Sequence, residues 1–85
     1  MGSEISVTVK LFAIYQETYQ AEQLTWQMPT GAIANDVLER IFSEHPHLAN
    51  WRDVTRLGVN LEFVEPDTPL KSGDEVVLIP PVSGG

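Results

Sequence analysis

The last six residues of the sequence are the ones whose types and order most clearly suggest chemistry. Two consecutive prolines remove backbone donors and keep the chain extended, so any strand must end before them. The two final glycines have no side chains, so this segment could enter a channel too narrow for other residues. The pattern predicts a tail, residues 80–85, that delivers the backbone carboxylate of Gly85 into the active site of another protein. The predicted tail consists of Pro80, Pro81, Val82, Ser83, Gly84 and Gly85.

Other candidate groups carry weaker signals. The sequence contains no cysteine, which excludes disulfides, zinc–thiolate sites, iron–sulfur clusters and a persulfide on this chain. His45 and His47 lie two residues apart around Pro46 and do not share a helical face, so we predict surface positions and no metal site. Asp74 and Glu75 follow a Lys-Ser-Gly segment, and we interpret them as turn residues.

Length and charge limit the function further. Eighty-five residues form one domain, and a net charge of −7 argues against nucleic-acid binding because phosphates would be repelled. The sequence has no apolar run of roughly 18 residues, the length that crosses a membrane, and its first residues lack the features of a secretory signal. We expect a soluble, cytoplasmic protein that binds neither nucleic acid nor membrane.

Hydrophobic periodicity predicts the strands that position the tail. Apolar and polar residues alternate in segments 5–11, 24–28 and 57–63, which is the period of a half-buried strand. Residues 76–79 are continuously apolar, which is typical of a central strand covered on both faces. We expect the polar segment 15–20 to be the loop of a hairpin.

One helix is predicted between the second and third strands. From Ile33 the apolar spacing becomes helical, and Pro46 ends the pattern. Residues 47–56 give no clear assignment. The apolar face of the helix is predicted to consist of Ile33, Val37, Leu38, Ile41 and Phe42.

The order of elements is therefore strand, strand, helix, strand, strand. Such an order is typical of an α+β domain in which one main helix packs on a mixed sheet of four to five strands. A hairpin at the start and a central strand at the end favour the ubiquitin-like β-grasp. We predict a β-grasp domain at residues 1–79 and an extended tail at residues 80–85.

The predicted sheet leaves one face for a partner, because a single helix covers only the other. Phe12 breaks the inward alternation of the first strand and should lie on the uncovered face, together with one set of residues from the last strand. We predict a partner interface that includes Phe12 and Leu78. Phe63 is a weaker candidate, since its parity suggests the core.

The whole chain resembles the small subunit of molybdopterin synthase, the MoaD family, within the wider group of ubiquitin-like sulfur carriers. The most specific match is the tail, where that family has Pro-Pro-Val-Ser/Thr-Gly-Gly. Two positions depart from the pattern: Gln16 stands where Arg is frequent, and Ile33 stands at a helix cap that often carries Thr or Ser, which leaves the first amides to water or to Asp36. The other matching residues are Val9-Lys10-Leu11-Phe12-Ala13, Glu17, Gly31-Ala32, Asp36-Val37-Leu38, Val59-Asn60, Leu70 and Gly73-Asp74-Glu75-Val76.

The resemblance implies a sulfur carrier in molybdenum cofactor biosynthesis. An ATP-dependent adenylyltransferase of the ubiquitin-activating type would join the carboxylate of Gly85 to AMP, and a sulfur donor enzyme would displace AMP to leave a thiocarboxylate. The tail would then enter the large subunit of molybdopterin synthase, in an assembly of two small and two large subunits, and give its sulfur to cyclic pyranopterin monophosphate to form molybdopterin. The chain would bind no cofactor and have no activity alone, since the partner uses the ATP.

Other functions stay open on the sequence. A ubiquitin-like carrier could serve another pathway, such as thiamine, tRNA thiolation or cysteine synthesis. A protein modifier would conjugate Gly85 to lysines of target proteins, and a plain interaction domain would have an inert tail. A mass gain on the chain indicates a carrier, whereas a ladder of conjugates indicates a modifier.

Overall fold

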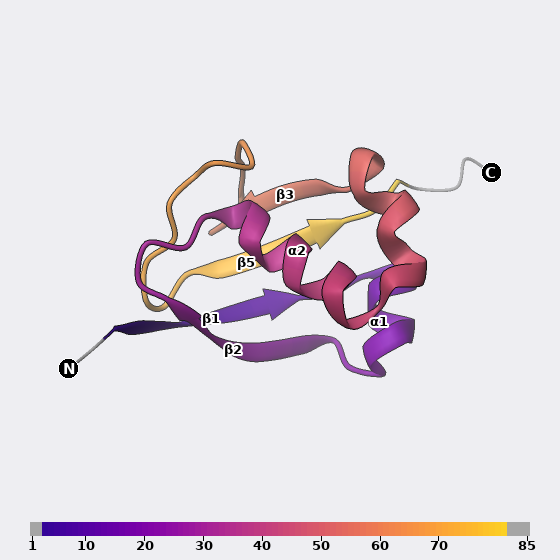
Figure 1. Cartoon of the computed structure of the whole chain (residues 1–85). Coiled ribbons are helices and arrows are strands. Elements are labelled where there is room, and N and C mark those ends of the chain that lie inside the picture. Colours follow the sequence, from indigo (N-terminus) through magenta and orange to yellow (C-terminus); the bar gives the residue numbers. More distant parts are fainter. Residues whose placement is uncertain (1–2, 82–85) are drawn as a thin grey trace.

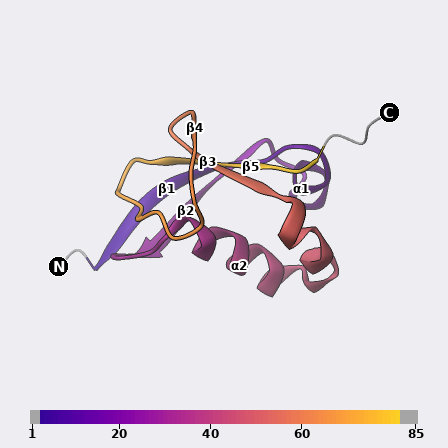
Figure 2. The same ribbon diagram turned by 90° about the horizontal axis from the view of Figure 1, so that it is seen from above.

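The computed structural model describes residues 3–81, which form one mixed sheet with helices on one side (Figure 1, Figure 2). The sheet order is β2-β1-β5-β3-β4, with β1 and β5 parallel and the other neighbours antiparallel. The last strand is therefore central, as its apolar run predicts. In chain order the elements are β1 (Glu4–Lys10), α1 (Ala13–Tyr19), β2 (Gln23–Pro29), α2 (Ala34–Glu44), the 3-10 helix η1 (Pro46–Val54), β3 (Arg56–Val59), β4 (Glu62–Phe63) and β5 (Glu75–Ile79).

Helix α2 lies across one face of the sheet and builds the core there (Figure 2). Its predicted apolar face is confirmed: Val37, Leu38, Ile41 and Phe42 are buried, and Ile33 is the partly buried residue that precedes the helix. The sheet residues that complete this core are Val7, Val9, Trp26, Met28, Leu57, Val59, Val76 and Leu78.

The first two amides of α2 are bound by backbone carbonyls of the protein, so the expectation that water or Asp36 serves them is wrong. The N–H groups of Ala34 and Asn35 each donate at 2.8 Å to backbone carbonyls in segment 66–68. Asp36 serves the residue before the helix, since its carboxylate accepts from the N–H of Ile33 at 2.9 Å. These carbonyls replace a capping side chain, which is why an isoleucine is tolerated at this position.

The expected hairpin loop at residues 15–20 is wrong, because this segment lies largely within helix α1. Tyr15 is fully buried, and its hydroxyl lies 2.6 Å from Oγ1 of Thr55. Tyr19 follows four residues later and packs against the same core. A helix of seven residues with polar side chains between its tyrosines is too short to show a clear period.

The predicted third strand, residues 57–63, is two strands joined by a tight turn. Asn60 and Leu61 have φ angles of 52° and 74°, and after this turn Phe63 pairs with Gly58. Leucine in the second turn position hides the Asn-Gly signal that such hairpins usually show. The turn also changes the parity of the strand, so the expectation that Phe63 faces the core is wrong: its side chain is 67% exposed.

The unassigned segment 47–56 is mostly the 3-10 helix η1, which packs beside α2 (Figure 2). Leu48 is buried there, and Trp51 is partly buried against the core. Within residues 3–81, no helix is long and apolar enough to cross a membrane.

Candidate functional site

The predicted tail follows directly after the central strand. β5 ends at Ile79, as the two prolines predict. Pro80 is buried and Pro81 is exposed, so Pro80 packs as part of the domain. The predictions for Val82, Ser83, Gly84 and Gly85 lie outside the described residues.

The face of the sheet opposite α2 carries no helix among residues 3–81 (Figure 2). We call it the open face. Along β5, Val76 and Leu78 are fully buried under α2, whereas Val77 and Ile79 are partly exposed on the open face. The prediction that Leu78 lines an interface is therefore wrong, because its side chain belongs to the core. The central strand has an apolar residue on each side, and sequence alone does not decide which set meets the helix.

A shallow apolar hollow of about 230 Å³ lies on the open face. Gly58 creates it, because a Cβ there would lie 3.3 Å from the carbonyl oxygen of Glu62 and 3.7 Å from Cβ of Val77. The hollow can accept an apolar side chain of a partner. Its lining residues are Gly58, Leu61, Glu62, Phe63, Val77 and Ile79.

Two cationic residues border this hollow. The guanidinium carbon of Arg56 lies 5.6 Å from the centroid of the Phe63 ring, and Arg56 pairs with Ile79 in the β3–β5 register. Lys10 pairs with Val77 from the other side. On a chain with a net charge of −7, this positive border favours a partner that places carboxylates around its apolar residues.

Phe12 extends the open face towards the tail. Its side chain is 48% exposed, so its predicted position outside the core is confirmed. The backbone of Phe12 is extended, and continuing the register that pairs Lys10 with Val77 brings Phe12 opposite Ile79. Phe12, Ile79 and the start of the tail at Pro80 therefore lie at the same end of the sheet. The interface role of Phe12 and Phe63 stays a prediction.

The histidines and the carboxylate pair considered in the sequence analysis make contacts within the fold. The carboxylate of Asp74 accepts from the N–H of Lys71 at 2.8 Å and from Nδ2 of Asn60 at 2.9 Å, so its interpretation as a turn residue is confirmed. The same interpretation is wrong for Glu75, which is the first residue of β5. The rings of His45 and His47 meet edge to face with centroids 5.9 Å apart. Among residues 3–81, no group of three His, Cys, Asp or Glu side chains could hold a metal ion. The described part of the chain has an exposed apolar surface with a positive border near the base of the tail.

Sequence patterns predict only a small part of this surface. Val77 and Ile79 had a signal, since one of the two sets of the central strand had to lie on the uncovered face. Gly58 and Leu61 had none, because they are brought to the hollow by a turn that the residue types conceal. Arg56 was not predicted either, as its position depends on the β3–β5 register.

Comparison with known proteins agrees with this geometry. The chain matches the ThiS family over residues 9–85. The molybdopterin synthase sulfur carrier subunit of Chlamydomonas reinhardtii is 35% identical over 83 residues, which cover 95% of this chain and 100% of that protein. The predicted resemblance to molybdopterin synthase small subunits is thereby confirmed.

Two solved structures show the same fold. Small archaeal modifier protein 1 of Haloferax volcanii superposes with a TM-score of 0.77 at 25% identity, covering 92% of this chain and 99% of that chain. A chain from the complex of subunits 1 and 2 of molybdopterin-converting factor from Helicobacter pylori 26695 gives a TM-score of 0.63 at 28% identity, covering 95% and 100%. The predicted ubiquitin-like β-grasp is confirmed by these likenesses.

Proposed function

The chain belongs to the ThiS family, and from this premise we propose that it is the sulfur carrier subunit of a molybdopterin synthase. The observation that carries the proposal is the likeness to the Chlamydomonas protein of that name, which this chain covers over its full length. The Helicobacter complex supports a large-subunit partner, since there a protein of this fold is bound to a second subunit. A cytoplasmic location and an assembly of two small and two large subunits are parts of the proposal.

The proposed chemistry takes place on the carboxylate of Gly85. In the activating enzyme, a carboxylate oxygen attacks the α-phosphorus of ATP, pyrophosphate leaves, and a glycyl adenylate forms. A donor enzyme supplies sulfur at the oxidation level of sulfide, the sulfur attacks the carbonyl carbon, and AMP leaves. The product is a thiocarboxylate. In the large subunit its sulfur is transferred to cyclic pyranopterin monophosphate, and hydrolysis returns Gly85 to the carboxylate.

The role of the domain in this chemistry is to position the tail at the active site of the partner. With the open face docked on the large subunit, the tail starts beside Phe12 and Ile79, and six extended residues reach at most about 20 Å from there. Docking makes the transfer effectively intramolecular, while acid–base groups come from the partner. The absence of cysteine is compatible with this mechanism, because the sulfur resides on the backbone carboxylate.

Intact-mass measurement tests the proposal. The chain is coexpressed with an activating enzyme and a sulfur donor, and we expect a mass gain of about 16 Da, the difference between sulfur and oxygen. Deletion of Gly85 should abolish this gain and molybdopterin formation, with an unchanged circular dichroism spectrum. Gly84→Val should block entry of the tail by its bulk, whereas the control Ser83→Thr adds a methyl group at a position where the family accepts threonine. Sulfur transfer by the chain without Gly85 would contradict the assignment of the working group.

A second candidate function is protein modification, favoured by the likeness to small archaeal modifier protein 1. A modifier would join the carboxylate of Gly85 to lysine amines of other proteins. Incubation of the tagged chain with cell extract and ATP distinguishes the two functions. A ladder of tagged conjugates without the mass gain would favour the modifier over the carrier.

A further inference from the structure

Strand β2 is the long outer edge of the sheet. Among the described residues it pairs only with β1, and the bond from the N–H of Leu11 to the carbonyl of Glu22 fixes which of its groups face that strand. Because hydrogen-bonding positions alternate along a strand, the N–H and C=O groups of Gln23, Thr25 and Gln27 point away from the sheet. The strand has seven residues and no charged side chain. A long, uncharged edge of this kind is a template for pairing with another chain.

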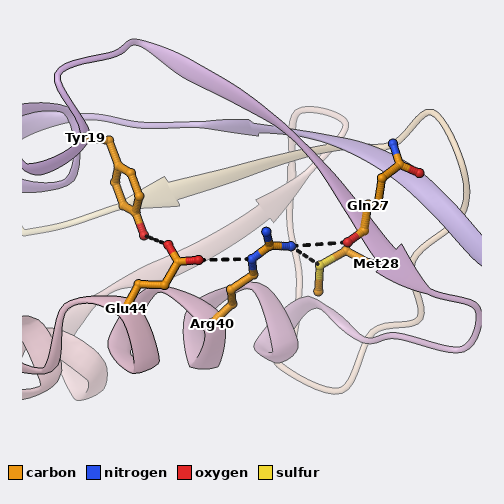
Figure 3. Close-up of polar contacts among 5 residues, drawn as sticks. All are labelled: Tyr19, Gln27, Met28, Arg40 and Glu44. Carbon is orange, nitrogen blue, oxygen red and sulfur yellow. Dashed lines mark hydrogen bonds and ion pairs between the residues drawn. The ribbon is translucent and has the colours of Figure 1, made fainter.

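An arginine from α2 covers part of this edge (Figure 3). One terminal nitrogen of Arg40 donates to the carbonyl of Gln27 at 3.2 Å, and the guanidinium carbon lies 4.1 Å from the centroid of the Trp26 ring. Nε of Arg40 lies 3.4 Å from one carboxylate oxygen of Glu44, and the other oxygen accepts from the hydroxyl of Tyr19 at 2.8 Å. Three elements, α1, β2 and α2, therefore hold the guanidinium at the edge.

The rest of the edge suits a second copy of the same strand. If two β2 strands pair antiparallel about a two-fold axis at Thr25, each N–H of Gln23 meets the carbonyl of Gln27 in the other copy. The facing side chains are then threonine against threonine and glutamine against glutamine. No like charges lie directly opposite each other, which matters in a chain with a net charge of −7.

The position of Arg40 and this pairing exclude each other. The carbonyl of Gln27 that accepts from Arg40 is the acceptor that Gln23 of the second copy would need. The Trp26 ring beneath the guanidinium is the surface that Leu24 of the second copy would cover. The opposite edge of the sheet needs no such cover, because β4 has two residues.

We propose that Arg40 keeps the β2 edge from pairing with a second copy of this chain, and that its removal produces a two-fold dimer joined through β2. The surface is distinct from the open face, so the dimer leaves the proposed docking surface free. The inference does not depend on the proposed function.

Sedimentation velocity over a concentration series tests the inference on the full chain. The wild type should stay monomeric over this series. Arg40→Ala should dimerise, with a dissociation constant at least about tenfold below that of the wild type. The matched control is Arg52→Ala, which also removes an arginine that contacts a carboxylate, Glu39, and an aromatic ring, Phe42, but lies away from β2. It should remain monomeric.

A second substitution identifies the surface. Thr25→Pro removes the N–H at the proposed two-fold axis, and proline is tolerated where an edge N–H points to solvent. Arg40→Ala with Thr25→Pro should be monomeric again. A monomeric Arg40→Ala variant, a wild type already dimeric through β2, or a double variant that still dimerises would overturn the inference. If Arg40→Ala fails to fold, Arg40→Met decides, since it removes every donor to the carbonyl of Gln27 but keeps an unbranched side chain on α2: dimerisation supports the inference and a monomer overturns it.

Discussion

The two faces of the sheet carry apolar residues from the same strands but have different surroundings. On the covered face, Val76 and Leu78 of β5 are fully buried beneath α2. On the open face, Val77 and Ile79 of the same strand remain partly exposed beside the hollow at Gly58. Alternation within one strand thus divides its residues into a set that stabilises the domain and a set that is available to a partner.

The difference shows how a small domain can leave apolar residues exposed on one face of its sheet without losing its fold. Each square ångström of apolar surface buried contributes about 25 cal/mol, whether it is buried in folding or in association. The covered face uses this contribution in folding. In the proposed docking, the open face would use the same contribution in association, and the exposed apolar area is limited because Gly58 has no side chain there.

The largest expected effect comes from replacing Leu78 by alanine, compared with the same change at its neighbour Ile79 on the other face. Leu78→Ala should lower the free energy of unfolding by about 2–5 kcal/mol, since it leaves a cavity under α2. Ile79→Ala should lower it by less than about 1.5 kcal/mol, because the side chain is already partly in water. Urea unfolding followed by tryptophan fluorescence measures both. Equal losses would mean that the two faces do not differ as the structure indicates.

The second prediction tests the open face as a docking surface and rests on the proposed function. Phe12→Asp should weaken binding to the large subunit at least about tenfold, because it places a carboxylate in a surface that must be desolvated. Its effect on unfolding should be small, as the side chain is 48% exposed. Titration calorimetry with the purified large subunit measures the affinity.

The matched control is Ser43→Asp. Ser43 is exposed and lies on α2, on the covered side of the sheet, so this variant adds a carboxylate away from the open face. This variant should bind as the wild type does. If both variants lose affinity equally, the loss comes from added negative charge, and the interface is not at the open face.

The features that could be predicted from the sequence depend on local pattern. The helical spacing from Ile33 to Phe42 and the apolar run of β5 gave the helix and the central strand, because both patterns persist over enough residues. Phe12 was placed outside the core by the same alternation. The tail indicated the family resemblance, since its combination of residue types is unusual.

The features that were missed depend on contacts far apart in sequence. Leu78 was assigned to the wrong face because a strand with apolar residues on both sides contains no signal for which set meets α2. The carbonyls of segment 66–68 that bind the first amides of α2 come from more than 30 residues away along the chain. The position of Arg40 on β2 likewise depends on how helix and edge strand meet.

The smallest expected effect concerns the two tyrosines, which belong to the covered side. Oγ1 of Thr55 donates to the carbonyl of Trp51 at 2.8 Å, so the hydroxyl of Tyr15 must be the donor in its own bond to Thr55. Tyr15→Phe removes that bond and leaves Oγ1 of Thr55 with one partner fewer. We expect a loss of about 1 kcal/mol in the free energy of unfolding at neutral pH.

The same residues should make stability fall at alkaline pH. Burial raises the pKa of Tyr15, and burial together with Glu44 raises the pKa of Tyr19. In the unfolded chain tyrosine has a pKa of about 10. The stabilisation by the neutral phenols is therefore complete below that pH and is lost as the pH rises towards the higher pKa values of the folded protein. Urea unfolding at increasing pH measures the decline. The double variant Tyr15→Phe, Tyr19→Phe contains no tyrosine but keeps both lysines, so it provides the baseline for other titrations. If the stability of the wild type declines no more steeply than that of this variant, folding does not raise the pKa values of the two tyrosines.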